Sequence, residues 1–112
     1  MTDLRTYISL IRQTGDLKII KKKVSTKYEI AGITAKVDGS HAILFENIAE
    51  SDFNLVANLV GTRKRFAQAI GSTEAKIHET IISAIKKAKK PKVISSGKFM
   101  ENSSKNISIM PI

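Results

Sequence analysis

The chain of 112 residues has no cysteine, which excludes disulfides, a thiolate nucleophile and cysteine metal ligands. A cysteine-free chain is also compatible with a reducing compartment. The first ten residues carry charged side chains and lack the apolar core of a signal peptide. No apolar run approaches the roughly 18 residues that a membrane span needs. These absences predict a cytoplasmic protein.

Residues that suggest chemistry are few as well. The ten acidic residues are scattered, and no Ser, Thr or Lys stands in a pattern that would pair it with a base. No glycine-rich segment has the spacing of a phosphate-binding loop. His41 is a weak candidate for a ligand or an acid–base group, because no second histidine lies near it in the sequence. The sequence therefore predicts no catalytic, cofactor-binding or metal-binding residue, and disfavours an autonomous enzyme.

What the chain does have is positive charge, with 19 basic against 10 acidic residues and a net charge of +9. Such a balance favours either contact with nucleic acid, anionic lipid or an acidic partner, or a solvated lysine-rich surface. Two groups of cations stand out, one at the start of a predicted helix and one at the end of another. The candidate anion or partner contacts are Arg63, Lys64, Arg65, Lys86, Lys87 and Lys90.

Both groups also have a local interpretation. Cations in a first helical turn oppose the helix dipole, so 63–65 call for an anion or for a surface salt bridge, and the salt bridge is the simpler explanation. Lysines at a helix C-terminus are favourable without any partner. The scarcity of aromatics, with two Tyr, four Phe and no Trp, counts against single-strand binding by base stacking.

The first half of the sequence predicts helix, strand and helix. An apolar stripe at helical spacing predicts a helix over 3–14, with Thr2 as N-cap and Gly15 after its end. Residues 17–24 predict an edge strand protected by Lys21–Lys23. A capping box of Thr26 and Glu29 predicts a second helix over 27–38. Inside it, Gly32 either costs stability or permits close packing on the sheet.

The second half predicts two strands, 42–48 and 53–60, and then two helices. Within the second strand, the amide of Asn58 is expected to be satisfied by the neighbouring turn. Thr62 is the predicted N-cap of a helix over 63–70, and Gly71 its closing residue. Ser72 or Thr73 is the predicted cap of a longer helix over 74–89.

Beyond Pro91, the sequence predicts a short strand at Val93-Ile94, a polar linker over 95–105 and an apolar strand-like terminus. The predicted fold class is α+β, a single domain with a small mixed β-sheet flanked by about four helices. Residues 1–94 would form the domain, and residues 95–112 a polar linker and a terminal strand that needs a partner, either in this domain or in another chain.

Several motifs resemble the N-terminal domain of the UbiD-type decarboxylases, which are similar to 3-polyprenyl-4-hydroxybenzoate carboxy-lyase. The most distinctive are Leu44-Phe45-Glu46-Asn47, then Asn58-Leu59-Val60-Gly61-Thr62, and Arg65 with Gly71. Further similarity extends from the first helix to Met110-Pro111-Ile112, which resembles the point where the family's flavin-binding domain begins, so residues 95–112 would lead into such a domain. Ser25 and His41 depart from the family pattern, where aspartate and proline are usual.

The resemblance implies a role in a decarboxylase of aromatic or unsaturated acids that uses prenylated FMN with a metal ion. The flavin-binding and Glu-Arg-Glu residues of that family lie beyond residue 112, so none is carried over. A structural, non-catalytic N-terminal domain or small subunit is therefore expected, with a flavin-binding chain or domain as partner and homo-oligomers possible. The alternatives are a basic nucleic-acid-binding module and an evolutionary remnant without a partner.

Overall fold

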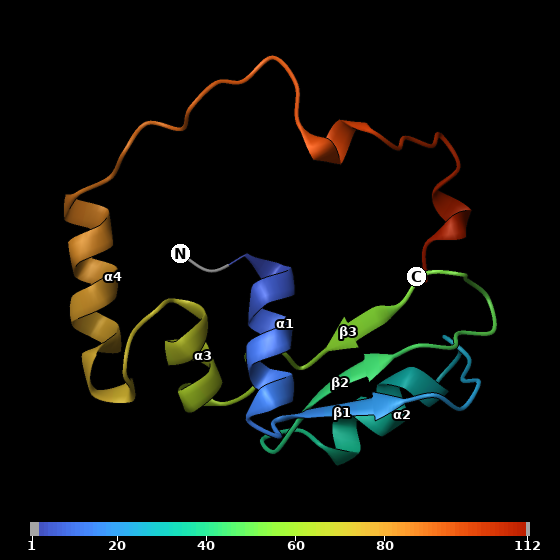
Figure 1. Ribbon diagram of the computed structural model, residues 1–112. Coiled ribbons are helices and arrows are strands. Elements are labelled where there is room, and N and C mark those ends of the chain that lie inside the picture. The colour runs from blue at the N-terminus through green and yellow to red at the C-terminus, as the bar shows by residue number, and fades with distance from the viewer. Residues whose placement is uncertain (1–2, 112) are drawn as a thin grey trace.

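The computed structural model describes residues 3–111, which contain four α-helices and a three-stranded mixed sheet (Figure 1). The predicted α+β class with a small mixed sheet is confirmed. The elements in chain order are α1 (Leu4–Gln13), β1 (Leu17–Ile20), α2 (Glu29–Lys36), β2 (Ala42–Phe45), β3 (Leu55–Ala57), α3 (Arg63–Ala69) and α4 (Ile77–Lys86). Three short 3-10 helices occupy Glu74–Lys76, Lys98–Met100 and Ile107–Ile109.

The strand order is β1-β2-β3. β1 runs parallel to β2, with Leu17 opposite Ala42, and α2 makes the crossover between them. β3 is antiparallel to β2, with Leu55 opposite Phe45. β1 is thus an edge strand, as predicted, but it ends at Ile20. Val24 only bridges to Ile48, and the three lysines in between are exposed.

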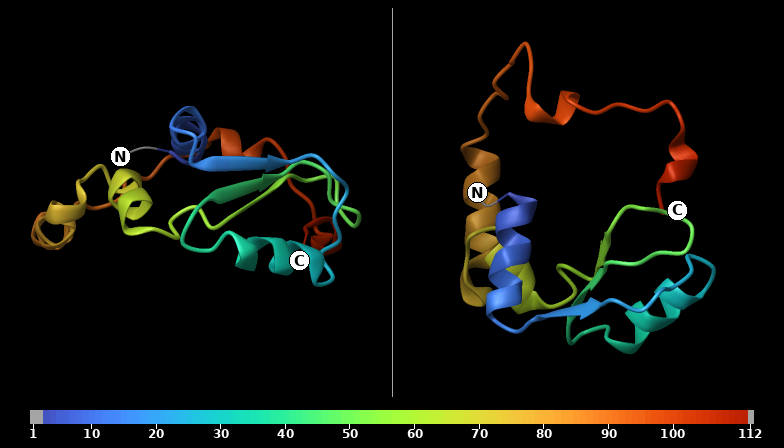
Figure 2. Two further views of the ribbon diagram at one scale, coloured as in Figure 1. Left: turned by 90° about the horizontal axis from the view of Figure 1, so that it is seen from below. Right: turned by 45° about the vertical axis from the view of Figure 1, so that its right-hand side comes forward.

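β2 forms the centre of the core because both of its faces are buried. Ala42 packs in a cluster with Tyr7 and Ile11 of α1, whereas Ile43 and Phe45 point to the opposite cluster, which includes residues of α2. The alternation follows from the two-residue period of a strand. Figure 2 shows the resulting layers, with α1 and α2 on opposite sides of the sheet. α4 lies beyond α3, away from the sheet (Figure 1).

The two helix starts in the first half differ from the prediction. Asp3, not Thr2, caps α1, because its carboxylate accepts from the Thr6 N–H at 2.8 Å; Thr2 lies outside the described residues. The Thr26–Glu29 capping box is wrong. Glu29 Oε2 instead accepts from the Ser25 N–H at 2.6 Å, one residue earlier. This shift places Tyr28 at φ +69°, and the Glu29 N–H bonds back to the Lys27 carbonyl in a tight γ-turn.

The helix predicted over 74–89 is shorter in the structure. A 3-10 turn takes its first residues, and α4 ends at Lys86, before Lys89 and Lys90. Neither predicted cap operates: Thr73 makes no capping bond, and the Ser72 hydroxyl pairs with that of Thr80 at 2.7 Å. Val93-Ile94 forms no strand, and the strand-like terminus is a 3-10 turn over 107–109.

The chain is less compact than a monomer of its size. Its radius of gyration is 16.8 Å, against about 13 Å for a folded chain of this length. Its accessible surface is 9000 Å², against about 6,100 Å² expected from a mass of 12.3 kDa. Figure 1 shows the cause: the segment after α4 arches away from the body and returns only near the β2–β3 loop. Ser51 Oγ meets it there, donating to the Ile109 carbonyl at 2.5 Å.

Gly32 does not serve close packing, because it is exposed and a Cβ built on it meets nothing within 4 Å. Gly32→Ala should therefore raise the free energy of unfolding by about 1 kcal/mol, the difference in helix propensity. Urea unfolding followed by circular dichroism measures it. Gly15→Ala is the matched control: it also has free space, but its φ of +78° makes alanine destabilising. A loss of stability in Gly32→Ala would contradict the open surface above α2.

Candidate interaction surface

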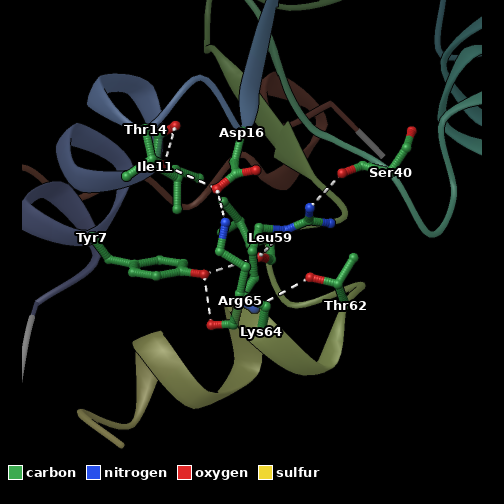
Figure 3. A network of polar contacts seen from close by, with 9 residues as sticks. All are labelled: Tyr7, Ile11, Thr14, Asp16, Ser40, Leu59, Thr62, Lys64 and Arg65. Atoms are coloured by element: carbon green, nitrogen blue, oxygen red, sulfur yellow. Dashed lines mark hydrogen bonds and ion pairs between the residues drawn. The ribbon is translucent and has the colours of Figure 1, made fainter. Parts of the chain in front are cut away.

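Arg65, one of the predicted contacts, lies in the interior with 1% of its surface exposed. Its Nε donates to the Leu59 carbonyl at 3.1 Å and Nη1 to the Ser40 carbonyl at 2.7 Å (Figure 3). Its Nη2 donates to the Asn58 carbonyl at 3.1 Å. The guanidinium fork thus joins the turn after β3 to the connection before β2. The prediction of an anion or partner contact at Arg65 is wrong, because its donors are bound to carbonyls of this chain.

Tyr7 completes this network from α1. Its hydroxyl lies 2.9 Å from the Arg65 carbonyl and 3.1 Å from the Leu59 carbonyl, both acceptors for its single proton (Figure 3). Burial raises the pKa of the phenol, with the Arg65 charge acting in the opposite direction. Tyr7 and Arg65 therefore bind α1, α3 and the end of β3 into one unit.

Asn58 holds the same region from the other side. It adopts φ +56°, which ends β3 three residues before the predicted strand end at Val60. Its amide is satisfied, as expected, but by carbonyls that precede β2: His41 at 2.8 Å and Val37 at 3.4 Å. The His41 ring is partly buried, with Nδ1 unpaired among the described residues. No group of three or more potential metal ligands occurs in residues 3–111.

Of the three cations at the start of α3, only Arg65 is buried. Lys64 Nζ lies 3.5 Å from Asp16 Oδ2, which confirms the predicted surface salt bridge for this residue. The Thr14 hydroxyl and, secondarily, Lys64 hold the pKa of the Asp16 carboxyl below its usual value. Arg63 donates to the Glu74 carbonyl at 3.3 Å and stays exposed.

The second basic group lies at a separate place. Lys86 ends α4, and Lys87 and Lys90 follow it, all exposed. α4 is a ten-residue helix, so its length of about 15 Å lies between this group and the 3-10 turn that Arg63 contacts. The structure therefore does not gather the predicted contacts into one patch.

The α4 helix also exposes most of its apolar stripe. Ile77 is buried at 6%, but Ile81, Ile82 and Ile85 are exposed at 38%, 52% and 71%. At 100° per residue, these last three lie within an arc of about 100° on the helix. The following segment adds further exposed apolar side chains: Val93, Ile94, Phe99, Met100, Ile107, Ile109 and Met110. Exposed apolar side chains in this number are typical of a surface that contacts a partner.

Residues 8–85 match the family described as the 3-octaprenyl-4-hydroxybenzoate carboxy-lyase N-terminal domain. The match covers more than half of the chain, from α1 to the last turn of α4. The chain belongs to this family. The resemblance in the sequence motifs is thereby confirmed.

Solved structures of larger enzymes share the fold of this UbiD-type N-terminal domain. The UbiD-class enzyme HmfF from Pelotomaculum thermopropionicum, in an evolved dimeric form with prFMN, has a TM-score of 0.73 and 28% identity over 77% of this chain. HmfF with FMN has a TM-score of 0.71 and 29% identity over 74% of this chain. Vanillic acid decarboxylase of Sedimentibacter hydroxybenzoicus, in its open form, has a TM-score of 0.62 and 21% identity over 77%, which shows a shared fold.

The chain spans only about a fifth of these enzymes, 20% of the HmfF chain and 19% of the decarboxylase chain. The remaining four fifths have no counterpart in the residues described. No helix within residues 3–111 is long and apolar enough to cross a membrane.

The main feature that sequence reasoning missed is the buried role of Arg65 with Tyr7. The local sequence places Arg65 in a basic run at a helix start, and it could not reveal that carbonyls from two separate turns converge on the guanidinium. One signal was available. Arg65, Asn58, Leu59 and Thr62 all belong to the motifs that carry the family resemblance, and all four lie in or beside this network.

Proposed function

We propose that this UbiD-type domain is the non-catalytic N-terminal part, as domain or small subunit, of a prenylated-FMN-dependent (de)carboxylase of aromatic or unsaturated acids. The observation that carries this proposal is the excess of exposed surface. The chain exposes about 2,900 Å² more than a compact monomer of its mass. Obligate interfaces bury areas of this order. The chain therefore has a surface suited to a permanent partner, and the fold family indicates a flavin-carrying decarboxylase chain.

Neither the cavity beside β3 nor the start of α3 fits a flavin phosphate. The cavity of about 670 Å³ between β3 and residues 102–111 is lined by apolar side chains, Asn and Ser, with no Lys or Arg among them. The N-terminal end of α3 is occupied by the Thr62 hydroxyl, which accepts from the Arg65 N–H at 3.2 Å. Arg65 itself is bound to carbonyls. Flavin, metal ion and substrate would then be held by the partner, and no catalytic step is assigned to this chain.

Residues 1–94 would act as the organising domain, and residues 95–112 as the segment that enters the flavin-binding part. The 3-10 turns at 98–100 and 107–109 and their exposed apolar side chains are suited to packing on a second body. Neither the family match nor the structural neighbours favour the nucleic-acid alternative.

The test is recovery of the tagged chain from its own cells, followed by native mass spectrometry and flavin absorbance. We expect a complex with a larger chain that carries stoichiometric flavin and decarboxylates an aromatic or unsaturated acid. The purified chain alone should show no flavin absorbance. Recovery of the chain by itself, or with nucleic acid that washes off in salt, would refute the proposal.

A further inference from the structure

α4 is a family element without a place in the core of this chain. Nine of its ten residues lie within the matched residues 8–85, yet no α4 side chain belongs to either of the two clusters around β2. Only its first residue, Ile77, is buried. A surface helix normally turns its apolar stripe toward the core. α4 instead exposes Ile81, Ile82 and Ile85 to solvent. The helix itself lies beyond α3, at the edge of the molecule (Figure 2).

The C-terminal end of this stripe is strongly basic. Five lysines lie between residues 86 and 92: Lys86, Lys87, Lys89, Lys90 and Lys92. All five are exposed, and no carboxylate of the described chain lies within ion-pair distance of them. An apolar stripe ending in unpaired cations fits a partner groove that is apolar along its floor and acidic at one end.

We infer that α4 is the docking helix of this domain, and that the flavin-carrying decarboxylase chain receives it in an apolar groove with carboxylates facing Lys86–Lys92. The inference rests on the proposed function, which supplies the occupant: the enzymes that share this fold are about five times as long as this chain. The excess of about 2,900 Å² belongs to α4 and the extended segment after it together, and it exceeds the roughly 800 Å² per side of a standard interface.

The apolar half of the inference is tested with the full chain carrying Ile82→Ser and Ile85→Ser. Both side chains are more than half exposed, so the melting temperature of the chain alone should stay unchanged. The retention of the flavin-carrying chain on the immobilised variant should weaken about 100-fold, as expected from losing two buried isoleucines. Tyr28→Ser is the matched control, since Tyr28 is 90% exposed and lies in the turn before α2, away from α4. It should retain the partner at wild-type affinity.

The proposed acidic end of the groove is tested with a triple variant that carries Lys86→Glu, Lys87→Glu and Lys90→Glu. The control is a second triple variant with the same change in net charge, which carries Lys21→Glu, Lys22→Glu and Lys23→Glu. The first triple should slow association about tenfold at low salt, and the difference should shrink as salt rises. The control triple should bind at a rate much closer to wild type. Equal slowing by both triples would show a net-charge effect and overturn the acidic groove.

The outcomes separate the two proposals. If the wild-type chain recovers no flavin-carrying partner, the proposed function fails and the inference with it. If wild type and the isoleucine variant recover that partner equally well, the proposed function stands and α4 is not the docking helix. If sedimentation shows a wild-type dimer that the isoleucine variant abolishes, α4 binds a second copy, and the inference is overturned in favour of self-association.

Discussion

Replacing Arg65 with alanine should lower the free energy of unfolding by about 4 kcal/mol, a large part of the stability of a domain this size. The substitution leaves a cavity where a fully buried side chain was and removes three hydrogen bonds to carbonyls. The Ser40 carbonyl suffers most, since the Leu59 carbonyl keeps Tyr7 as a donor and the Asn58 carbonyl keeps the Gly61 N–H. A buried acceptor without a donor costs about 1–3 kcal/mol. Urea denaturation followed by circular dichroism measures the change.

Two further variants separate the contribution of the guanidinium geometry from that of the positive charge. Arg65→Lys keeps the cation but cannot reach all three carbonyls, so it should cost about 2 kcal/mol. Lys64→Ala, next to it on the exposed side of α3, should cost no more than about 0.5 kcal/mol, as is usual for surface ion pairs. If Arg65→Ala lowered the free energy of unfolding as little as Lys64→Ala does, the result would contradict the buried network.

Phe45→Ala should have an effect of similar size, about 3–5 kcal/mol. Phe45 is fully buried and packs with Val24, Ile43 and Ile48 on the face of the sheet that α2 covers. Truncation removes most of the ring and leaves a cavity that this short strand and its neighbours cannot fill. Thermal unfolding of the chain should therefore shift by many degrees, because each kcal/mol is worth about 4–8 °C in a domain of about this length.

The control for this variant is Phe53→Ala, a phenylalanine that lies in the loop before β3 and is 52% exposed. It should cost less than about 1 kcal/mol in the isolated chain. Phe45→Leu, which keeps most of the buried volume, should fall between the two. Equal losses in Phe45→Ala and Phe53→Ala would mean that the α2 side of the sheet is not a packed core.

The core elements could be predicted from sequence because their patterns are local. The period of α1, the apolar run of β2, Gly15 at the end of α1 and Thr62 at the start of α3 each depend on a few neighbouring residues. The mixed sheet consists of two parallel strands joined by a helix and a third strand that is antiparallel to its neighbour. These are the parts of the fold that the structure confirms.

The sequence predictions fail where contacts between residues far apart in the sequence determine the local structure. β3 is shorter than its apolar run because Asn58 leaves extended geometry to reach the carbonyls of His41 and Val37. The start of α2 is shifted by Ser25, whose hydroxyl donates to Glu50, a residue beyond β2. Arg65 was assigned to the surface for the same reason, since its acceptors come from separate turns. No local pattern encodes such convergence.

The exposed stretch after α4 has a consequence for the supply of this protein in the cell. Its residues 87–111 have few backbone hydrogen bonds and many uncovered apolar side chains, which are the features that proteases and chaperones recognise. If the proposed decarboxylase partner covers this stretch, a copy without the partner would be degraded faster than an assembled one. The amount of this polypeptide would then follow the amount of its partner, and stoichiometry would be set by selective turnover rather than by matched synthesis.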